Sequence, residues 1–308
     1  MKPIALRDAY GAAIPDFGVQ YPNLVVLDAD LATSTRTAGF QERFPDRYLN
    51  VGIAEQNMVA MAAGIALGGG MPAVNSFASF LTRRAADQIA ISVAYPRLNV
   101  KLFGFHAGIG LGEDGATQQA VEDLGIMQAI PNIRVYAPLD AGDLQAVLAE
   151  VFAVDGPTYV RLSRPATSPV VDDPHGPLPA YRVLRDGSDG VVVTTGTTSS
   201  DVVAAVDALA RDGIRLAVLG VSRLKPLDRS IADALAGKRL AVVEEHNVHG
   251  GLADALSMVL DERAVAHRIE RIAINDSFGE SGRPAELLAA CGLAGDPLRD
   301  RLQRWALG

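Results

Sequence analysis

The chain is poor in cysteine and lysine and carries no excess of positive charge. Its one cysteine, Cys291, excludes an internal disulfide framework and any zinc site built from several cysteines. The formal net charge of −8 argues against a nucleic-acid-binding surface, so we expect no nucleic-acid partner. Only four of the 28 basic residues are lysines. We therefore expect cationic sites to use arginine, whose guanidinium binds a phosphate or a carboxylate through two hydrogen bonds at once.

The opening sequence MKPIALRDAY lacks the basic and then apolar pattern of a signal peptide, so we expect a cytoplasmic protein. Residues 56–82 carry no charge and are long enough by themselves to cross a bilayer. The glycines Gly68–Gly70 and the proline Pro72 interrupt this stretch. A buried helix over Asn57–Leu67, a glycine turn and a buried strand over Pro72–Ser76 are expected instead of a membrane span.

Short apolar segments alternate with alanine-rich segments along residues 1–165, and this alternation predicts an α/β domain. In such a domain, a mostly parallel sheet has helices on both faces. The expected strands are Leu24–Leu27, Ala73–Ser76, Val100–Phe103, Arg134–Ala137 and Thr158–Leu162. The expected helices are Arg7–Phe17, Asn57–Leu67, Arg84–Val93, Thr117–Gln128 and Ala141–Phe152.

We expect a linker over residues 166–185, because residues 165–182 contain five prolines. A second, smaller α/β domain follows over residues 186–308, and the length of 308 residues suits two domains with cores of their own. Its expected strands are Gly190–Thr194, Arg215–Gly220, Arg239–Glu244 and Arg268–Ile274. Its expected helices are Ser200–Asp212, Ile231–Ala236 and Gly251–Leu260.

Glu55 is the most informative single residue. It lies in the run VGIAEQNMVAMAAG, where it follows a candidate strand and opens the charge-free helix. An acid at the mouth of a buried segment, with no cation close in sequence, requires a specific partner or a shifted pKa. The alternative is an acid that merely interacts favourably with the helix dipole. The local sequence leaves both interpretations open.

Three motifs in register resemble the pyrimidine-binding half of transketolases. They are GIAEQN at residues 52–57, SFASF at 76–80 and GLGEDG at 110–115. The resemblance extends to the end of the chain, where VVEEHNVHGGL at residues 242–252 is typical of the C-terminal domain of this family. It implies the pyrimidine domain of a thiamine diphosphate enzyme followed by a transketolase C-terminal domain.

The resemblance implies that thiamine diphosphate is the cofactor. In the family, a glutamate at the position of Glu55 bonds a nitrogen of the pyrimidine ring and favours the imino tautomer, whose exocyclic nitrogen removes the thiazolium proton. Phe77 and Phe80 match the aromatic residues that pack on the pyrimidine, although both also suit an ordinary core. Asp30 matches a position near the cofactor. Arg83 stands where common transketolases carry a tyrosine, and here FLTRRAADQI looks like 1-deoxyxylulose-5-phosphate synthase.

The resemblance also implies a binding site for a sugar phosphate. The four positions that would hold the phosphate are Arg7, Ser34, His106 and Arg164, and His106 also counts as a candidate catalytic residue. Asp114 matches an aspartate that contacts a substrate hydroxyl. Gln118 replaces the usual histidine; it forms hydrogen bonds but does not take up a proton near pH 7.

One family motif is missing. The diphosphate-binding half of these enzymes carries Gly-Asp-Gly followed by an asparagine, which hold a magnesium (or calcium) ion and the diphosphate. The two Arg-Asp-Gly runs, Arg185–Gly187 and Arg211–Gly213, do not replace it. We therefore assign no metal ligand to this chain and expect an N-terminal transketolase subunit as its partner, in an α2β2 heterotetramer.

The sequence thus predicts the C-terminal subunit of a split transketolase, a transferase of two-carbon ketol units between phosphorylated sugars that is active only with its partner. The alternative enzyme is a decarboxylating one, similar to 1-deoxyxylulose-5-phosphate synthase or to the beta subunit of a 2-oxo-acid dehydrogenase. A scaffold that kept the fold and lost activity is a third reading. The presence of Glu55, Phe77 and Phe80 argues against the scaffold.

Overall fold

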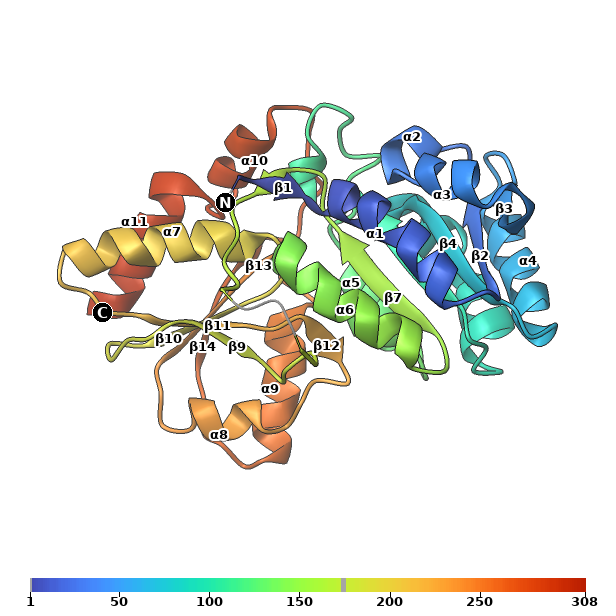
Figure 1. The fold of residues 1–308 in the computed structure, drawn as a ribbon. Helices are drawn as coiled ribbons and strands as arrows, with labels where there is room; N and C mark the ends of the chain where they lie inside the picture. Colours follow the sequence, from blue (N-terminus) through green and yellow to red (C-terminus); the bar gives the residue numbers. More distant parts are fainter. Residues whose placement is uncertain (1, 173–175) are drawn as a thin grey trace.

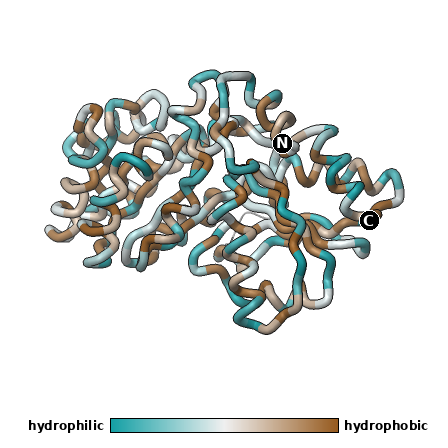
Figure 2. The backbone as a smooth tube through the Cα atoms, turned by 180° about the vertical axis from the view of Figure 1, so that it is seen from behind, coloured by the Kyte–Doolittle hydropathy of each residue, from teal (hydrophilic) through white to brown (hydrophobic). Residues whose placement is uncertain are grey.

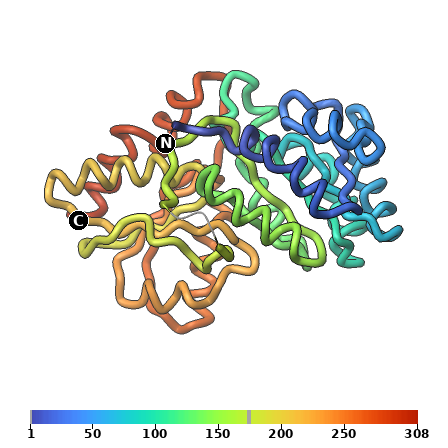
Figure 3. Tube along the Cα trace, in the orientation of Figure 1, coloured from blue at the N-terminus to red at the C-terminus, as the bar shows by residue number. Residues whose placement is uncertain are grey.

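Two large β-sheets organise the chain in the computed structural model, which describes residues 2–172 and 176–308 (Figure 1). Both sheets have helices packed on both faces, which confirms the predicted α/β fold class. Figure 3 follows the chain from the first sheet, in blue and green, to the second, in yellow, orange and red.

The first sheet is built from β2 (Leu24–Asp28), β3 (Tyr48–Asn50), β4 (Met71–Phe77), β5 (Lys101–Phe105), β6 (Arg134–Tyr136), β7 (Thr158–Leu162) and β12 (Arg223–Lys225). Their order is β12-β6-β7-β5-β4-β2-β3, and each neighbouring pair is parallel except β12 with β6. The strands β4, β5 and β7 are buried at every position, as expected of parallel strands covered on both sides.

Alternate side chains of these strands point into two cores. Leu27, Val74 and Leu102 pack against one group of helices, and Val26, Phe103 and Val160 pack against another. The first group is α4 (Glu55–Leu67), η2 (Phe80–Arg84), η3 (Gln88–Ala94) and α5 (Asp123–Ala129). The second group is α1 (Leu6–Gln20), α3 (Ala38–Arg43) and α6 (Ala141–Ala153). Single turns lie at α2 (Ala32–Thr35), η1 (Pro45–Arg47) and η4 (Ile109–Leu111).

The second sheet is built from β9 (Arg182–Arg185), β10 (Val191–Thr194), β11 (Ala217–Gly220), β13 (Leu240–Asn247) and β14 (Ile269–Ile274), in the order β14-β13-β10-β11-β9. One face packs on α7 (Thr198–Arg211), α10 (Pro284–Ala290) and α11 (Gly295–Leu307), and the other on α8 (Ile231–Leu235) and α9 (Leu252–Glu262). Apolar segments concentrate on these inner strands, whereas polar segments follow the outer turns (Figure 2).

The two halves of the chain interlock. The strand β12 comes from the second half, yet it pairs with β6 and extends the first sheet. The start of the chain, β1 (Ile4–Ala5), pairs antiparallel with β8 (Ala166–Thr167) in the segment after the first sheet. One apolar core joins α4 and α5 of the first half to α8 and α9 of the second. The domain boundaries at residues 165 and 186 stay a prediction.

One local expectation was wrong. The helix expected over Thr117–Gln128 begins only at Asp123, because residues 117–122 form turns in which the Gln119 amide donates to the backbone carbonyls of Ile109 and Glu280. The segment predicted to be a linker contains β8, and its end forms β9, which pairs with β11. Residues 173–175 of that linker lie outside the described residues.

The helix expected over Arg84–Val93 is divided between η2 and η3, which are two wide π-helical segments. The charge-free stretch of residues 56–82 folds as the buried helix α4, a glycine turn and the buried strand β4. Within the described residues, no helix is long and apolar enough to cross a membrane.

Candidate functional site

Glu55 begins α4 and is 1% exposed. Its carboxylate accepts a hydrogen bond from Arg84 Nη1 at 2.7 Å and another from Ser76 Oγ at 3.4 Å. Burial of a carboxylate is costly unless such partners compensate it. The fold therefore brings the guanidinium of Arg84 to Glu55 from 29 residues away along the chain. Glu55 thus has a specific cationic partner in addition to the dipole of its helix. Half of the Arg84 side chain remains exposed, so the pair lies at the edge of the interior.

An aromatic surface adjoins the Glu55–Arg84 pair. Phe77 ends β4 and Phe80 begins η2, and their rings stack with centroids 5.4 Å apart. The Arg84 guanidinium lies 4.8 Å from the centroid of Phe80, and the imidazole of His106 lies 4.4 Å from that of Phe77. A cavity of about 510 Å³ opens here, lined by Ser79, Phe80, Arg83, Arg84, Thr117 and Gln118. Flat rings beside a buried carboxylate suit a planar heteroaromatic ligand with a hydrogen-bonding edge.

A cationic cluster continues from this aromatic surface. Arg7 lies in α1, while His106 and Arg164 follow β5 and β7, at the carboxyl edge of the sheet where α/β proteins usually bind ligands. Arg7 Nη1 lies 3.3 Å from His106 Nε2. Because a guanidinium only donates, Nε2 accepts and the ring proton belongs on Nδ1. Among the described residues, His106 Nδ1 and Arg7 Nε are buried and have no hydrogen-bond partner.

Burial, and then the positive charges of Arg7 and Arg164, lower the pKa of His106 to about 3. The ring is therefore neutral at physiological pH and acts through hydrogen bonds rather than charge. Arg164 donates to the carbonyl of Leu111 at 3.0 Å and lies 3.5 Å from the carboxylate of Asp114. These two contacts of Arg164 place the loop that carries Asp114 beside the cationic cluster.

The remaining predicted residues have separate environments. Asp30 exchanges hydrogen bonds with Asn50, at 3.1 and 3.2 Å, where β2 and β3 end. Ser34 is half-buried in the single turn α2. Gln118 is a wall of the cavity and accepts a hydrogen bond from Thr117. Contacts thus join Glu55 to Arg7 through the aromatic rings and His106, whereas Asp30 and Ser34 lie outside that chain of contacts.

The two consecutive arginines have different partners. Arg83 pairs with Glu122 and donates to the carbonyl of Gln119 at 3.0 Å, whereas Arg84 contacts Glu55. Sequence reasoning singled out Arg83 and missed Arg84 and Glu122. The repeated arginine in FLTRRAADQI was the available signal, but both arginines end a π-helical segment, and the sequence does not indicate which of them contacts Glu55.

Comparison with known proteins gives two matches that follow each other along the chain. Residues 2–169 match the transketolase pyrimidine-binding domain, and residues 180–297 match the transketolase C-terminal domain. The chain belongs to the transketolase family. It is 39% identical over 300 residues to a Methanocaldococcus jannaschii protein provisionally named a transketolase C-terminal section, with 96% of this chain and 95% of that protein covered.

Two further transketolase-family proteins resemble the chain over most of its length. One is a 6-deoxy-6-sulfo-D-fructose transketolase subunit of a Clostridium species, 37% identical over 280 residues, with 90% of this chain and 87% of that protein covered. The other is a solved structure described as a split-gene transketolase in an inactive beta4 tetramer. It is 35% identical, has a TM-score of 0.87 and covers 99% of both chains.

No three histidine, cysteine, aspartate or glutamate side chains within residues 2–172 and 176–308 are arranged to hold a metal ion. The transketolase-family motifs at residues 52–57, 76–80 and 110–115 instead provide one buried acid, two stacked rings and a loop. These groups suit the recognition of an organic ring.

The state of His106 gives a first prediction. The imidazole should stay neutral, with its proton on Nδ1, from pH 8 to pH 5, which nitrogen-15 NMR of the labelled ring measures directly. The pKa of His106 is lowered in the folded chain, whereas in the unfolded chain it lies near 6.5. The neutral ring therefore contributes fully to the free energy of unfolding above about pH 6.5, and this contribution is lost as the pH falls from there toward 3. Arg7→Ala should raise the pKa, although burial, the larger cause, remains. A midpoint near 6.5 in the unaltered chain would contradict the assignment.

Proposed function

We propose that this chain is the C-terminal subunit of a split transketolase, which transfers a two-carbon ketol unit between phosphorylated sugars with thiamine diphosphate. The observation that carries the proposal is the buried Glu55 carboxylate beside the stacked rings of Phe77 and Phe80. The family membership supports it, as do the relatives named as a transketolase section and a transketolase subunit.

The groups present fit the pyrimidine end of the cofactor. The cavity is lined by the ring of Phe80, which stacks on Phe77, and by Ser79, whose buried Oγ has no hydrogen-bond partner among the residues that the structure describes. When bound, thiamine diphosphate supplies a carbon nucleophile that accepts and releases the ketol unit. Arg84 occupies the open side of Glu55, so an incoming ring has to share or replace that contact.

Glu55 has the role of an anionic hydrogen-bond acceptor at a ring nitrogen. Its burial strengthens that bond, since a low-dielectric surrounding weakens electrostatic interactions less than water does. A hydrogen bond to a charged partner of this kind contributes roughly 1.5–3 kcal/mol. Phe77 and Phe80 keep water from one face of the ring and fix its plane. Asp30 and Arg83 are proposed to act near the cofactor, as the family resemblance implies.

The cationic cluster is proposed to bind the phosphate of the sugar. Two guanidinium groups, Arg7 and Arg164, and the free Nδ1–H of neutral His106 are suitable donors to an anion, and Ser34 adds a hydroxyl. The similarity to a subunit that acts on 6-deoxy-6-sulfo-D-fructose extends the candidate anions to sulfonates. Asp114 and Gln118 are proposed to contact the sugar hydroxyls and the reacting carbonyl.

The diphosphate and its magnesium (or calcium) ion are proposed to bind mainly to a separate N-terminal subunit, in an α2β2 assembly. Large apolar side chains are exposed on and beside α4 and η3: Ile53, Leu67, Ile91 and Tyr95 are between 61% and 80% exposed. Exposed apolar surface on the helix that Glu55 begins is compatible with a protein partner there. The beta4 assembly of the related split-gene transketolase is described as inactive, which agrees with a missing partner.

Reconstitution tests the proposed function. The partner is sought as a neighbouring reading frame with the Gly-Asp-Gly and asparagine motif. With thiamine diphosphate and magnesium, the two subunits together should transfer a ketol unit from xylulose 5-phosphate to ribose 5-phosphate, whereas each subunit alone should not. Ketol transfer by this chain alone would refute the split arrangement. Carbon dioxide release from pyruvate by the complex, without ketol transfer, would favour the decarboxylating alternative.

Arg164→Ala tests the anion site in the same complex. The loss of a charge-assisted hydrogen bond should raise KM for a phosphorylated ketose roughly 10- to 100-fold. The KM for the unphosphorylated analogue should change little. Arg185→Ala is the matched control, because Arg185 has a similar exposure and pairs with Asp207 in the second domain. Equal effects of Arg164→Ala on both substrates would assign Arg164 a structural role.

A further inference from the structure

The loop over residues 108–120 carries Asp114 and Gln118, and its base is closed by one backbone hydrogen bond, from Gly108 N to the carbonyl of Ala120 at 2.8 Å. The loop leaves the first sheet after β5, but residues of the second domain pack against it. A Cβ at Gly112 would lie 3.0 Å from Pro284, and one at Gly115 would lie 2.6 Å from Ser281 Oγ. The second domain therefore packs directly against the loop that carries two of the proposed substrate-binding residues.

Glu245 of β13 reaches from the second domain into the base of this loop. Its side chain is buried, and Oε1 accepts a hydrogen bond from the backbone N–H of Gly110 at 2.7 Å. A Cβ on Gly108 would lie 2.2 Å from the same oxygen, and the φ of Gly108 is +82°. The carboxylate thus fills the space that a side chain at residue 108 would take. Gly108 is required both by this close approach and by its backbone conformation.

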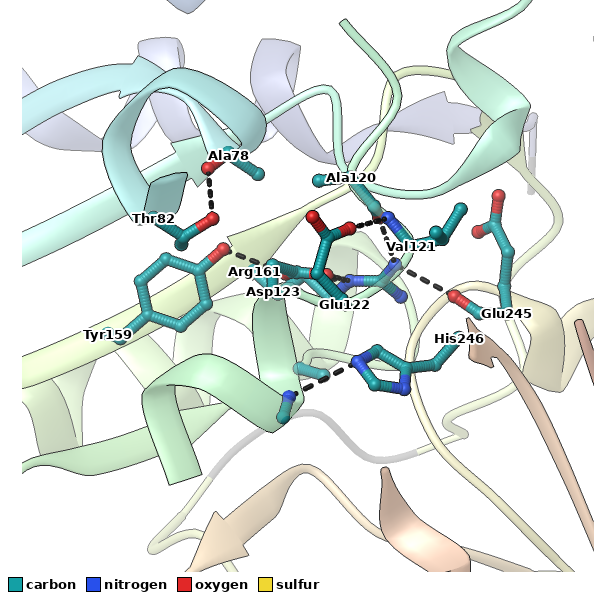
Figure 4. Close-up of polar contacts among 12 residues, drawn as sticks. Ala78, Thr82, Ala120, Val121, Glu122, Asp123, Tyr159, Arg161, Glu245 and His246 are labelled. Carbon is teal, nitrogen blue, oxygen red and sulfur yellow. Dashed lines mark hydrogen bonds and ion pairs between the residues drawn. The ribbon is translucent and has the colours of Figure 1, made fainter. Parts of the chain in front are cut away.

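The backbone of Glu245 is itself held in place. Arg161 in β7, which is 3% exposed, donates to the carbonyl of Glu245 at 2.8 Å and to that of Ala120 at 3.4 Å, while its Nε pairs with Asp123 (Figure 4). The next residues of β13 add two contacts. The N–H of Asn247 donates to the carbonyl of Val121 at 2.6 Å, and the ring of His246 accepts from the N–H of Gly125. The Glu245 side chain therefore extends from a fixed point toward Gly110.

The preceding residue provides a direct comparison. Glu244 is equally buried and also accepts backbone N–H groups, those of Leu252 at 2.6 Å and Ala253 at 3.0 Å. Because side chains alternate along a strand, Glu244 points to the start of α9 within its own domain. Two adjacent carboxylates of one strand thus have the same chemistry. Of these two carboxylates, Glu245 is the one that bonds the loop over residues 108–120.

We propose that Glu245 is a positioning residue, which holds the backbone of residues 108–112 from the second domain and thereby sets where Asp114 and Gln118 meet the sugar. The effect on the contacts of Asp114 and Gln118 with the sugar rests on the proposed function. The hydrogen bond by which Glu245 holds the loop does not depend on it. Burial raises the pKa of Glu245, and the charge of Arg161 opposes this shift only in part. The amide of Gln119, which donates to the carbonyl of Glu280 at 2.9 Å, adds a second link between the domains.

The test compares Glu245→Ala, Glu245→Gln and Glu244→Ala in the complex with the N-terminal subunit. In Glu245→Ala, the Gly110 amide loses its acceptor, so hydrogen–deuterium exchange over residues 108–120 should accelerate roughly tenfold or more. The value of kcat/KM for the sugar phosphates should fall roughly 10- to 100-fold, because small misplacements of substrate contacts are costly. Thiamine diphosphate affinity should be unchanged, since Glu55, Phe77 and Phe80 lie on other elements.

The other two variants separate positioning from general stability. Glu245→Gln retains an oxygen acceptor and should recover most of the protection and of kcat/KM. Glu244→Ala should lower Tm but leave both exchange over residues 108–120 and kcat/KM unchanged. Unaltered exchange over this segment in Glu245→Ala would overturn the proposal, as would faster exchange with unaltered kcat/KM. If the unaltered complex transfers no ketol unit, the proposed function fails, and the exchange comparison alone then decides whether Glu245 holds the loop.

Discussion

The geometry of the candidate site depends on the buried guanidinium of Arg161. It is 3% exposed and pairs with Asp123, which is fully buried, so the two charges compensate each other where neither is hydrated. Removing one partner of such a pair typically costs ~3–5 kcal/mol, because the other charge remains buried. The remaining guanidinium hydrogen bonds go to the carbonyls of Ala120 and Glu245. One side chain thereby fixes β7, α5, the loop over residues 108–120 and the end of β13 relative to one another.

Two kinds of chemistry lie side by side in the candidate site. On one side lie Glu55, Phe77 and Phe80, which suit a planar ring; on the other lie Arg7 and the neutral His106, which suit an anion. The contact of Phe77 with His106 joins them, so the two ligands would lie next to each other. Large apolar side chains, Ile53 and Leu67 among them, are exposed on and beside α4, the helix that Glu55 begins.

The main strands and the site residues of the first domain were predictable from the sequence. Buried parallel strands appear in it as apolar runs, and the family motifs occur in register. The strands β4 and β7 lie close to their expected bounds, and Glu55 opens its helix. Contacts between distant segments were not predictable. The turns over residues 117–122 replace helix because Gln119 bonds backbone of the second domain, and β12 joins the first sheet from far along the chain. The contact of Arg84 with Glu55 likewise joins the π-helical segment η2 to the start of α4, 29 residues apart.

We propose that Glu55 activates a thiamine cofactor whose other end is held by a partner subunit. The rate at which the thiazolium carbon of thiamine diphosphate exchanges its proton for deuterium in the assembled complex tests this role. We expect fast exchange in the complex of unaltered subunits and a fall of several orders of magnitude with Glu55→Gln, whose neutral amide does not favour the imino tautomer. The Tm of that variant should change little. An unchanged exchange rate in a folded Glu55→Gln complex would show that Glu55 does not have this role.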